Sequence, residues 1–155
     1  MSKSVRRVTG VLQAAGLDIA PVEIGNATTA QMAADLLGCD VAQIAKSVML
    51  RGLVSGEAIL FVTSGACRVD DARASEVAGE ALGKAEAALI RAQTGFAIGG
   101  VAPVGHLMRP RALFDPHLLS FAQVWAAAGT PRDLFGMAPQ GLLTLCGADL
   151  AEFTA

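Results

Sequence analysis

Lys46 is the residue whose type and position most clearly suggest chemistry. It stands between Ala45 and Ser47 at the entrance of an apolar run, where an ammonium group that loses its hydration must find an anion. Ser47 places a hydroxyl beside it. The same pattern also fits a lysine whose stem lies along a sheet edge while its charge stays in water. The sequence leaves both interpretations open.

A glycine-rich segment, residues 95–105, is the second candidate. It holds four glycines and one proline in eleven residues, which indicates a structured loop whose backbone approaches another group closely. The segment lacks the Gly-Lys-Ser/Thr ending of a phosphate loop and the GxGxxG spacing of a dinucleotide loop. Both nucleotide-binding interpretations are therefore rejected.

Most other catalytic arrangements lack the residues that they need. His106 and His117 are the only histidines, they are too far apart for ligation from one helix, and the sequence has no HExxH, no CxxC and no tyrosine. We therefore expect no metal and no cofactor. Ser64 lacks the GxSxG context of a serine hydrolase and has no His–Asp pair that can be named.

The bulk properties favour a small intracellular domain. A chain of 155 residues suits one domain, residues 1–155, without a linker. The net charge of −2 argues against a broad basic face that follows nucleic acid, and no apolar run approaches the roughly 18 residues of a membrane helix. Three widely spaced cysteines suit a reducing compartment, so we expect a cytoplasmic protein without a membrane contact.

Hydrophobic spacing, caps and turn residues predict a mixed set of elements. We expect helices over residues 3–16, from 28 or 29 to 37, over 70–79, 85–93 and 139–146, and a helical turn at 41–45. We expect strands over 19–24, 47–53, 58–63, 112–114, 118–124 and 134–137, and a turn-rich return over 126–131. Because the order lacks a strict βαβ rhythm, the pattern favours an α/β or α+β domain with a curved, largely antiparallel sheet.

Several of these segments carry a resemblance when they are taken in order. They are residues 29–34 (TAQMAA), 43–47 (QIAKS), 61–65 (FVTSG), 94–105 (TGFAIGGVAPVG), 113–115 (LFD) and 137–143 (MAPQGLL). Together they resemble the YbaK/prolyl-tRNA synthetase-associated editing domain family across nearly the whole chain. Gly99 to Pro103 matches the GxxxP motif of that family, and Lys46 matches its essential lysine.

The resemblance implies a curved, mostly antiparallel mixed sheet flanked by helices, and hydrolysis of the ester between an amino acid and the terminal adenosine of tRNA. Lys46 would hold the terminal phosphate or ribose, and the N–H groups near Gly99 and Gly100 would face the ester carbonyl. Ser47 would touch the ribose or the amino acid. The remaining substrate-binding residues implied by the resemblance are Val101, Ala102, Pro103, His106 and Gly129.

The resemblance also implies a substrate and partners. The substrate is tRNA, with tRNA-Pro favoured, that carries cysteine, alanine, serine or threonine, and prolyl-tRNA synthetase is a candidate partner. Ser47 and the Ala128-Gly129 pair differ from the alanine-editing branch, so the amino acid stays open, as does the choice between monomer and homodimer. The alternatives are a non-catalytic module that binds a tRNA end or a synthetase and, least favoured, a small-molecule esterase.

Overall fold

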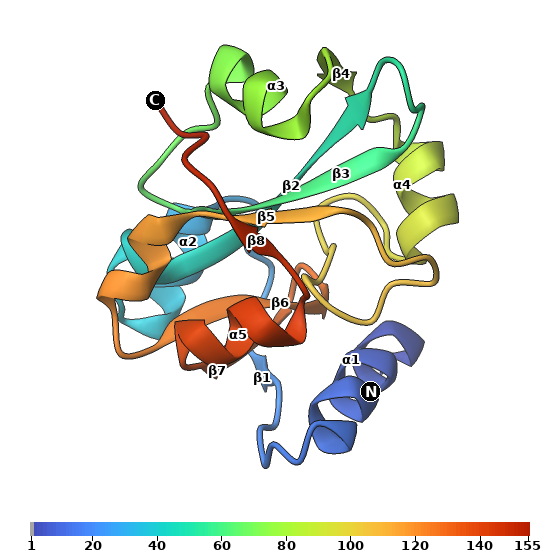
Figure 1. The fold of residues 1–155 in the computed structure, drawn as a ribbon. Helices are drawn as coiled ribbons and strands as arrows, with labels where there is room; N and C mark the ends of the chain where they lie inside the picture. The colour runs from blue at the N-terminus through green and yellow to red at the C-terminus, as the bar shows by residue number, and fades with distance from the viewer. Residues whose placement is uncertain (1) are drawn as a thin grey trace.

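A mixed sheet of eight strands forms the centre of the protein, with helices on both of its faces (Figure 1). The structure is a computed structural model that describes residues 2–155. The helices are α1 (Lys3–Ala14), α2 (Ala30–Leu37), α3 (Asp71–Ala78), α4 (Ala87–Thr94) and α5 (Pro139–Leu145), with short 3-10 helices η1 (Val41–Gln43) and η2 (Pro116–Ser120). The strands are β1 (Val22–Glu23), β2 (Ile44–Gly52), β3 (Ala58–Ser64), β4 (Leu82–Lys84), β5 (Ala112–Phe114), β6 (Val124–Thr130), β7 (Asp133–Met137) and β8 (Asp149–Leu150).

The sheet has the order β1-β7-β6-β2-β3-β5-β8, and β4 adds a second partner to one end of β2. Four of the pairings between these strands are antiparallel, whereas β2–β6, β3–β5 and β5–β8 are parallel. The expected mixed sheet flanked by helices is therefore confirmed.

The central strand β3 is buried along its whole length and serves two apolar cores. Ile59 and Phe61 point to the face covered by α3, whereas Leu60 and Val62 point to the face covered by α1, α4 and α5. This alternation follows from the period of two along a strand, and it explains why 58–63 reads as a continuous apolar run. None of the helices among residues 2–155 is both long and apolar enough to cross a membrane.

Local signals located most elements correctly. Thr29 caps α2 by accepting a hydrogen bond from the Met32 N–H, α5 begins at Pro139, and β2 and β3 form the expected antiparallel hairpin. Lys46, however, is the third residue of β2 rather than the residue at its entrance, because the strand begins at Ile44.

Three predicted elements were wrong or too long. Of the predicted strand 118–124 only Val124 is in a strand, β6, because the Asp115 side chain caps η2 and Pro116 starts it. The predicted turn at 126–131 is instead most of β6, where an irregularity between Ala127 and Thr130 accommodates Gly129. Only Val22 and Glu23 of the expected strand 19–24 are paired, and β8 was not predicted.

A gap in the sheet lies beside the middle of β2. On the side away from β3, β6 pairs with β2 only at Ile44 and Ala45, and β4 pairs with it only at residues 50–52. Residues 46–49 of β2 therefore have no strand beside them on that side within the described chain. Lys46 and Ser47, the pair singled out from the sequence, lie at this gap.

Candidate active site

A cavity of about 540 Å³ lies along the open edge of β2. Its size falls in the range of sites that enclose small ligands. Its walls come from the segment before α2, from β2, from the connection between β4 and α4, and from the β6–β7 turn. The lining residues are Ala27, Thr28, Thr29, Ala30, Ala33, Ile44, Ala45, Lys46, Ser47, Val48, Met49, Lys84, Ala85, Ile90, Ile98, Gly99, Val101, Ala127, Thr130, Pro131 and Leu134.

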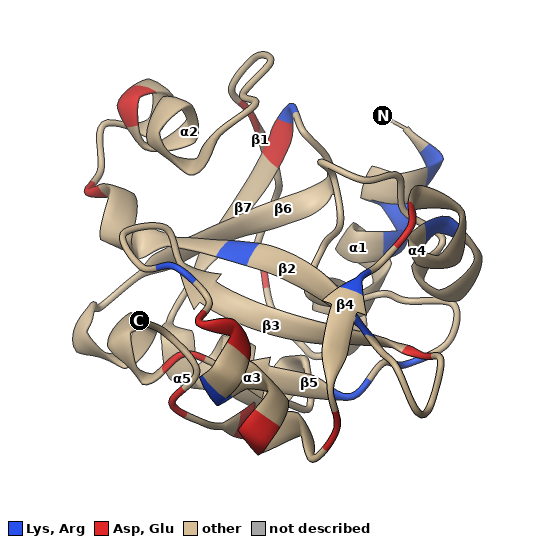
Figure 2. Cartoon of the chain, turned by 90° about the horizontal axis from the view of Figure 1, so that it is seen from above, with Lys and Arg blue, Asp and Glu red and all other residues tan. Residues whose placement is uncertain are grey.

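The charge of this cavity has one sign. Lys46 and Lys84 are the only charged residues among those that line it, and no histidine, cysteine or carboxylate does so in the described part of the chain. In Figure 2, α3, which does not line the cavity, contains acidic residues (red), whereas β2, which does line it, contains basic residues (blue). An apolar cavity with two ammonium groups favours ligands that offer anionic or carbonyl oxygens. It offers none of the usual ligands for a resident metal.

Lys46 is half-buried at the cavity wall and is held in place by one hydrogen bond. Its Nζ donates to the carbonyl oxygen of Cys67 at 2.8 Å. Burial lowers the pKa of Lys46 below that of an ordinary lysine, Arg68 lowers it further, and Cys67 and Asp115 oppose the shift. An ammonium group has three donors, so two remain for a ligand.

The carbonyl that holds Lys46 belongs to a tightly bonded turn after β3. The buried carboxylate of Asp115 accepts the Ser64 N–H at 3.0 Å, and the Ser64 hydroxyl donates to the Ala42 carbonyl at 2.8 Å. The Cys67 N–H in turn donates to the Ser64 carbonyl at 2.9 Å. Asp115 caps η2 and also fixes this turn.

Ser47 faces the opposite side of β2 from Lys46, because side chains alternate along a strand. Its Oγ is buried and has no hydrogen-bond partner within residues 2–155. The other cavity hydroxyls are engaged: Thr29 accepts from the Met32 N–H, and Thr28 and Thr130 donate to Met32 and Asp133. A buried hydroxyl without a partner is costly, so Ser47 is the group in this wall that a polar ligand would satisfy.

The backbone of β2 is also free at Ser47. Leu60 and Val62 of β3 direct their backbone groups to the β5 side, since the Leu60 N–H donates to Arg111 and the Val62 carbonyl accepts from Asp115. Phe61 and Thr63 therefore bond to β2 through their partners Val48 and Lys46. It follows that the N–H and C=O of Ser47 point into the gap.

The glycine loop meets the cavity at a tight turn. The Gly100 N–H donates to the Ala97 carbonyl at 3.0 Å, which leaves Gly99 exposed at the third position of the turn with a φ of +91°. Gly100 is buried, and a Cβ there would lie 2.8 Å from the Thr130 Cα. Glycine is therefore required at residue 99 for its positive φ and at residue 100 for its close contact with Thr130. The Gly100 N–H is bonded to Ala97 and is not free to bind an ester carbonyl.

The structure brings four of the nine residues predicted for the site to one cavity: Lys46, Ser47, Gly99 and Val101. The other five, Gly100, Ala102, Pro103, His106 and Gly129, do not line it. Ala102 is fully buried, and its carbonyl is 2.7 Å from His106 Nε2. Pro103 and His106 line a smaller hollow of about 200 Å³ elsewhere, and Gly129 packs against Ser4 of α1.

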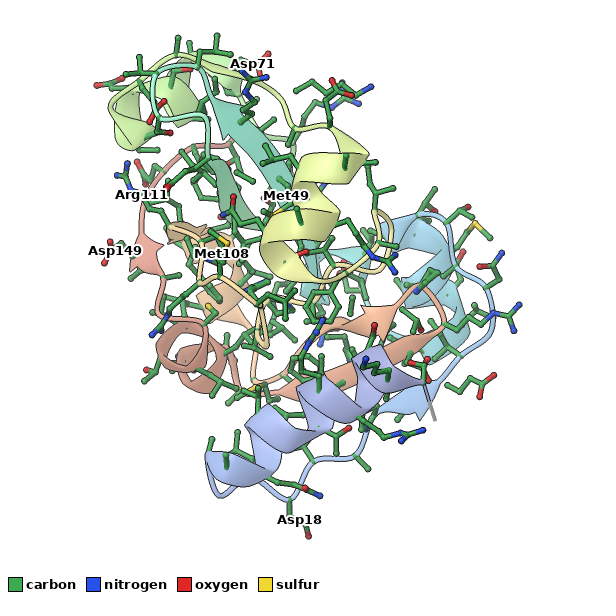
Figure 3. All side chains as sticks on the ribbon, turned by 90° about the vertical axis from the view of Figure 1, so that its right-hand side faces the viewer. Asp18, Met49, Asp71, Met108, Arg111 and Asp149 are labelled. Atoms are coloured by element: carbon green, nitrogen blue, oxygen red, sulfur yellow. The ribbon has the colours of Figure 1, made fainter. Side chains whose placement is uncertain are left out.

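Other lining residues were missed by the sequence analysis. Thr28 and Thr29 were predicted only as possible helix caps. Ile90, Lys84 and the turn at 130–131 belong to no functional motif, so the sequence did not assign them to a site. Met49 and Ile90 of α4 both line the cavity and belong to one apolar cluster, and Met49 is labelled beside α4 in Figure 3. Charged residues with no part in the cavity, such as Asp71 and Asp149, lie at the periphery of the same view.

Comparison with known proteins gives one consistent result. Residues 25–145 match the model of the aminoacyl-tRNA editing domain. A crystal structure described as a candidate trans-editing enzyme for prolyl tRNA synthetase is 43% identical, with a TM-score of 0.92 over 100% of this chain and 99% of that one. The structure of hypothetical protein APE2540 is 27% identical, with a TM-score of 0.87 over 96% and 99% of the two chains.

A curated relative agrees with this result. The uncharacterized protein YwhH of Bacillus subtilis (strain 168) is 30% identical over 125 residues, which cover 81% of this chain and 78% of YwhH. The region matched by the family model, residues 25–145, includes β2, the glycine loop and the β6–β7 turn, which enclose the cavity. With the matching family model and the shared fold, this shows that the chain belongs to the aminoacyl-tRNA editing domain (YbaK) family.

Proposed function

We propose that the protein is a trans-editing hydrolase that cleaves the ester of mischarged tRNA carrying cysteine, alanine, serine or threonine, with tRNA-Pro as the preferred tRNA. The observation that carries this proposal is the cavity: among residues 2–155, it is lined by the half-buried Lys46 and by a Ser47 Oγ without a hydrogen-bond partner, and by no acidic side chain. The description of the 43% identical structure supports the same kind of reaction.

In this proposal Lys46 binds the terminal adenosine of the tRNA. Its ammonium keeps two donors after its bond to Cys67, which suits a phosphate or ribose oxygen. Lys84 lines the same cavity and adds a second positive charge for the phosphate. The apolar wall from Ala27 to Ala33 then covers the nucleoside.

The amino acid occupies the other side of β2. Ser47 and Met49 share that face, and Ile90 and Val101 close it. Bulky apolar neighbours leave room for a small side chain, while the Ser47 hydroxyl and its backbone groups offer hydrogen bonds to the amino acid or ribose. Small amino acids are those that a synthetase pocket separates poorly, by about 1–3 kcal/mol per methylene.

Hydrolysis does not need a protein nucleophile here. An aminoacyl ester is already activated, and the vicinal ribose hydroxyl of the substrate can assist the attacking water. The protein binds and orients the ester, with Gly99 at the cavity wall beside the carbonyl. Gly100, Ala102, Pro103, His106 and Gly129 do not line this cavity, so in this proposal they shape the loop and its neighbours rather than touch the substrate.

The partners follow from the same proposal. Residues 1–155 act as one cytoplasmic editing domain on the aminoacylated 3′ end of tRNA, without a cofactor. The net charge of −2 gives the protein little attraction for the tRNA body, so prolyl-tRNA synthetase would help to deliver the substrate.

A non-catalytic module that binds a tRNA end would keep the same cavity, and deacylation assays separate it from an enzyme. Purified protein is mixed with tRNA-Pro charged with cysteine, alanine, serine, threonine or proline, with and without prolyl-tRNA synthetase. Selective release of one of the small non-cognate amino acids supports the proposal. Binding without release in every mixture supports the module, and hydrolysis of simple esters without RNA supports an ordinary esterase.

A further inference from the structure

A second cluster of reactive side chains lies outside the cavity. Cys67, Asp115 and His117 place one ligand atom each, all within 4.8 Å of one another. Cys67 follows the end of β3, and Asp115 and His117 follow the end of β5. Because β3 and β5 are parallel neighbours, the chain leaves both strands at the same edge of the sheet.

The cluster is anchored on its buried side and open on the other. The Asp115 side chain is 1% exposed, and its two oxygens accept the backbone N–H groups of Ser64 and His117. The His117 ring is 64% exposed, and its Nδ1 lies 2.7 Å from Asp115 Oδ1. Asp115 is thus fixed by the fold, whereas the imidazole can rotate to meet an ion from solvent.

The Cys67 thiol and the Asp115 carboxylate are direct neighbours and interact through a side-chain hydrogen bond. A divalent cation that binds both groups would replace the thiol proton between them, and its charge would balance the two anionic ligands. The Lys46 ammonium bonds to the carbonyl oxygen of Cys67 and not to its sulfur.

We propose that Cys67, Asp115 and His117 bind a divalent cation of the zinc type, with water completing its coordination. One sulfur, one imidazole nitrogen and one carboxylate oxygen are ligands that zinc accepts together, whereas calcium and magnesium prefer oxygen alone. On binding, the Cys67 thiol releases one proton to solvent as its sulfur bonds to the ion. His117 binds as a neutral ring, with its proton on the nitrogen that faces away.

This site does not depend on the deacylase proposal. The three residues are absent from the lining of the cavity, although Cys67 also supplies the carbonyl that holds Lys46. An ion bound to the Cys67 sulfur would therefore lie close to the Cys67 carbonyl, which positions Lys46. Metal binding is measured directly, so the result can be interpreted whether or not the protein releases amino acids from tRNA.

The test is a zinc titration of the full chain, first stripped of metal with a chelator, in competition with a chromophoric chelator. We expect one Zn²⁺ per chain, and affinity at least about tenfold weaker for Cys67→Ser and for His117→Gln. Cys39→Ser is the matched control, because Cys39 is also a partly buried free thiol but lies outside the cluster. It should bind zinc as the native protein does.

Cobalt provides a second readout, since a Co²⁺–thiolate bond absorbs in the near ultraviolet. The band should form in the native protein and in Cys39→Ser, and be absent from Cys67→Ser. Thermal unfolding without metal checks that each variant folds. Equal zinc affinity in the native protein and both ligand variants, or no stoichiometric binding by the native protein, would overturn the proposal.

Discussion

The Nζ of Lys46 donates a hydrogen bond of 2.8 Å to the carbonyl oxygen of Cys67, twenty-one residues further along the chain. This hydrogen bond holds the ammonium group of a strand residue in a fixed position at the cavity wall. The carbonyl is in turn held by a turn that Asp115 fastens through the Ser64 N–H. The position of the positive charge is therefore set by the fold and does not require a substrate.

Ser47→Ala should separate binding from stability. The Ser47 Oγ has no partner within residues 2–155, so its loss should leave the free energy of unfolding unchanged or raise it by up to about 1 kcal/mol. Deacylation should fall by roughly tenfold, because a hydrogen bond to the substrate is lost. Urea unfolding and kcat/KM measure the two effects. Ser120→Ala, an exposed position, is the control. Unchanged kcat/KM would remove Ser47 from the substrate site.

Gly100→Ala should destabilise the fold more than Gly99→Ala. A methyl group at residue 100 would lie 2.8 Å from the Thr130 Cα, an overpacking that costs about 1–3 kcal/mol. At residue 99 there is open space, and the cost is the positive φ alone, about 1 kcal/mol. Denaturant unfolding of both variants checks the order. A larger loss at Gly99 would contradict the turn geometry.

Acid should destabilise the protein partly through His106. Burial lowers the pKa of His106 below its ordinary value of 6.5, and Arg7 and Arg109 lower it further, against the hydrogen bond to Ala102. As the pH falls below 6.5, the unfolded chain takes up the proton first, so the free energy of unfolding decreases. The stability that His106 contributes is complete above that pH and is lost as the pH falls through the folded-state pKa.

The measurement is the free energy of unfolding of the native protein and His106→Gln between about pH 7.5 and pH 4.5, a range that spans the ordinary histidine pKa. The difference between the two should shrink as the pH falls. A difference that stays constant would mean that the imidazole is protonated equally easily in both states.

The helices and the hairpin could be predicted because their signals are local. Caps such as Thr29, the proline at 139 and the apolar run of β3 each act within a few residues. The segment 126–131 was predicted wrongly because its glycine and proline indicate a turn, whereas pairing with β7 makes most of it a strand. Tertiary pairing of this kind has no local signal.

The candidate site was only partly predictable for the same reason. Lys46 and Gly99 carry motifs, but the cavity also needs Ile90 and Thr130, whose roles come only from the way β2 is left unpaired between β4 and β6. The donor assigned to Gly100 was wrong in detail, since its N–H closes the turn with Ala97. The sequence motifs therefore located Lys46 and the glycine loop. Which of their hydrogen-bonding groups are free to meet a ligand depends on the pairing of the strands and on the turn of the loop.

The most direct test of the account is single-turnover deacylation of the preferred mischarged tRNA-Pro by the native protein and Lys46→Ala. Lys3→Ala is the control, because Lys3 lies on α1 and does not line the cavity. We predict a loss of at least about a hundredfold for Lys46→Ala, with its fold retained, and no change for Lys3→Ala. Equal rates for Lys46→Ala and the native protein would contradict the assignment of this cavity as the editing site.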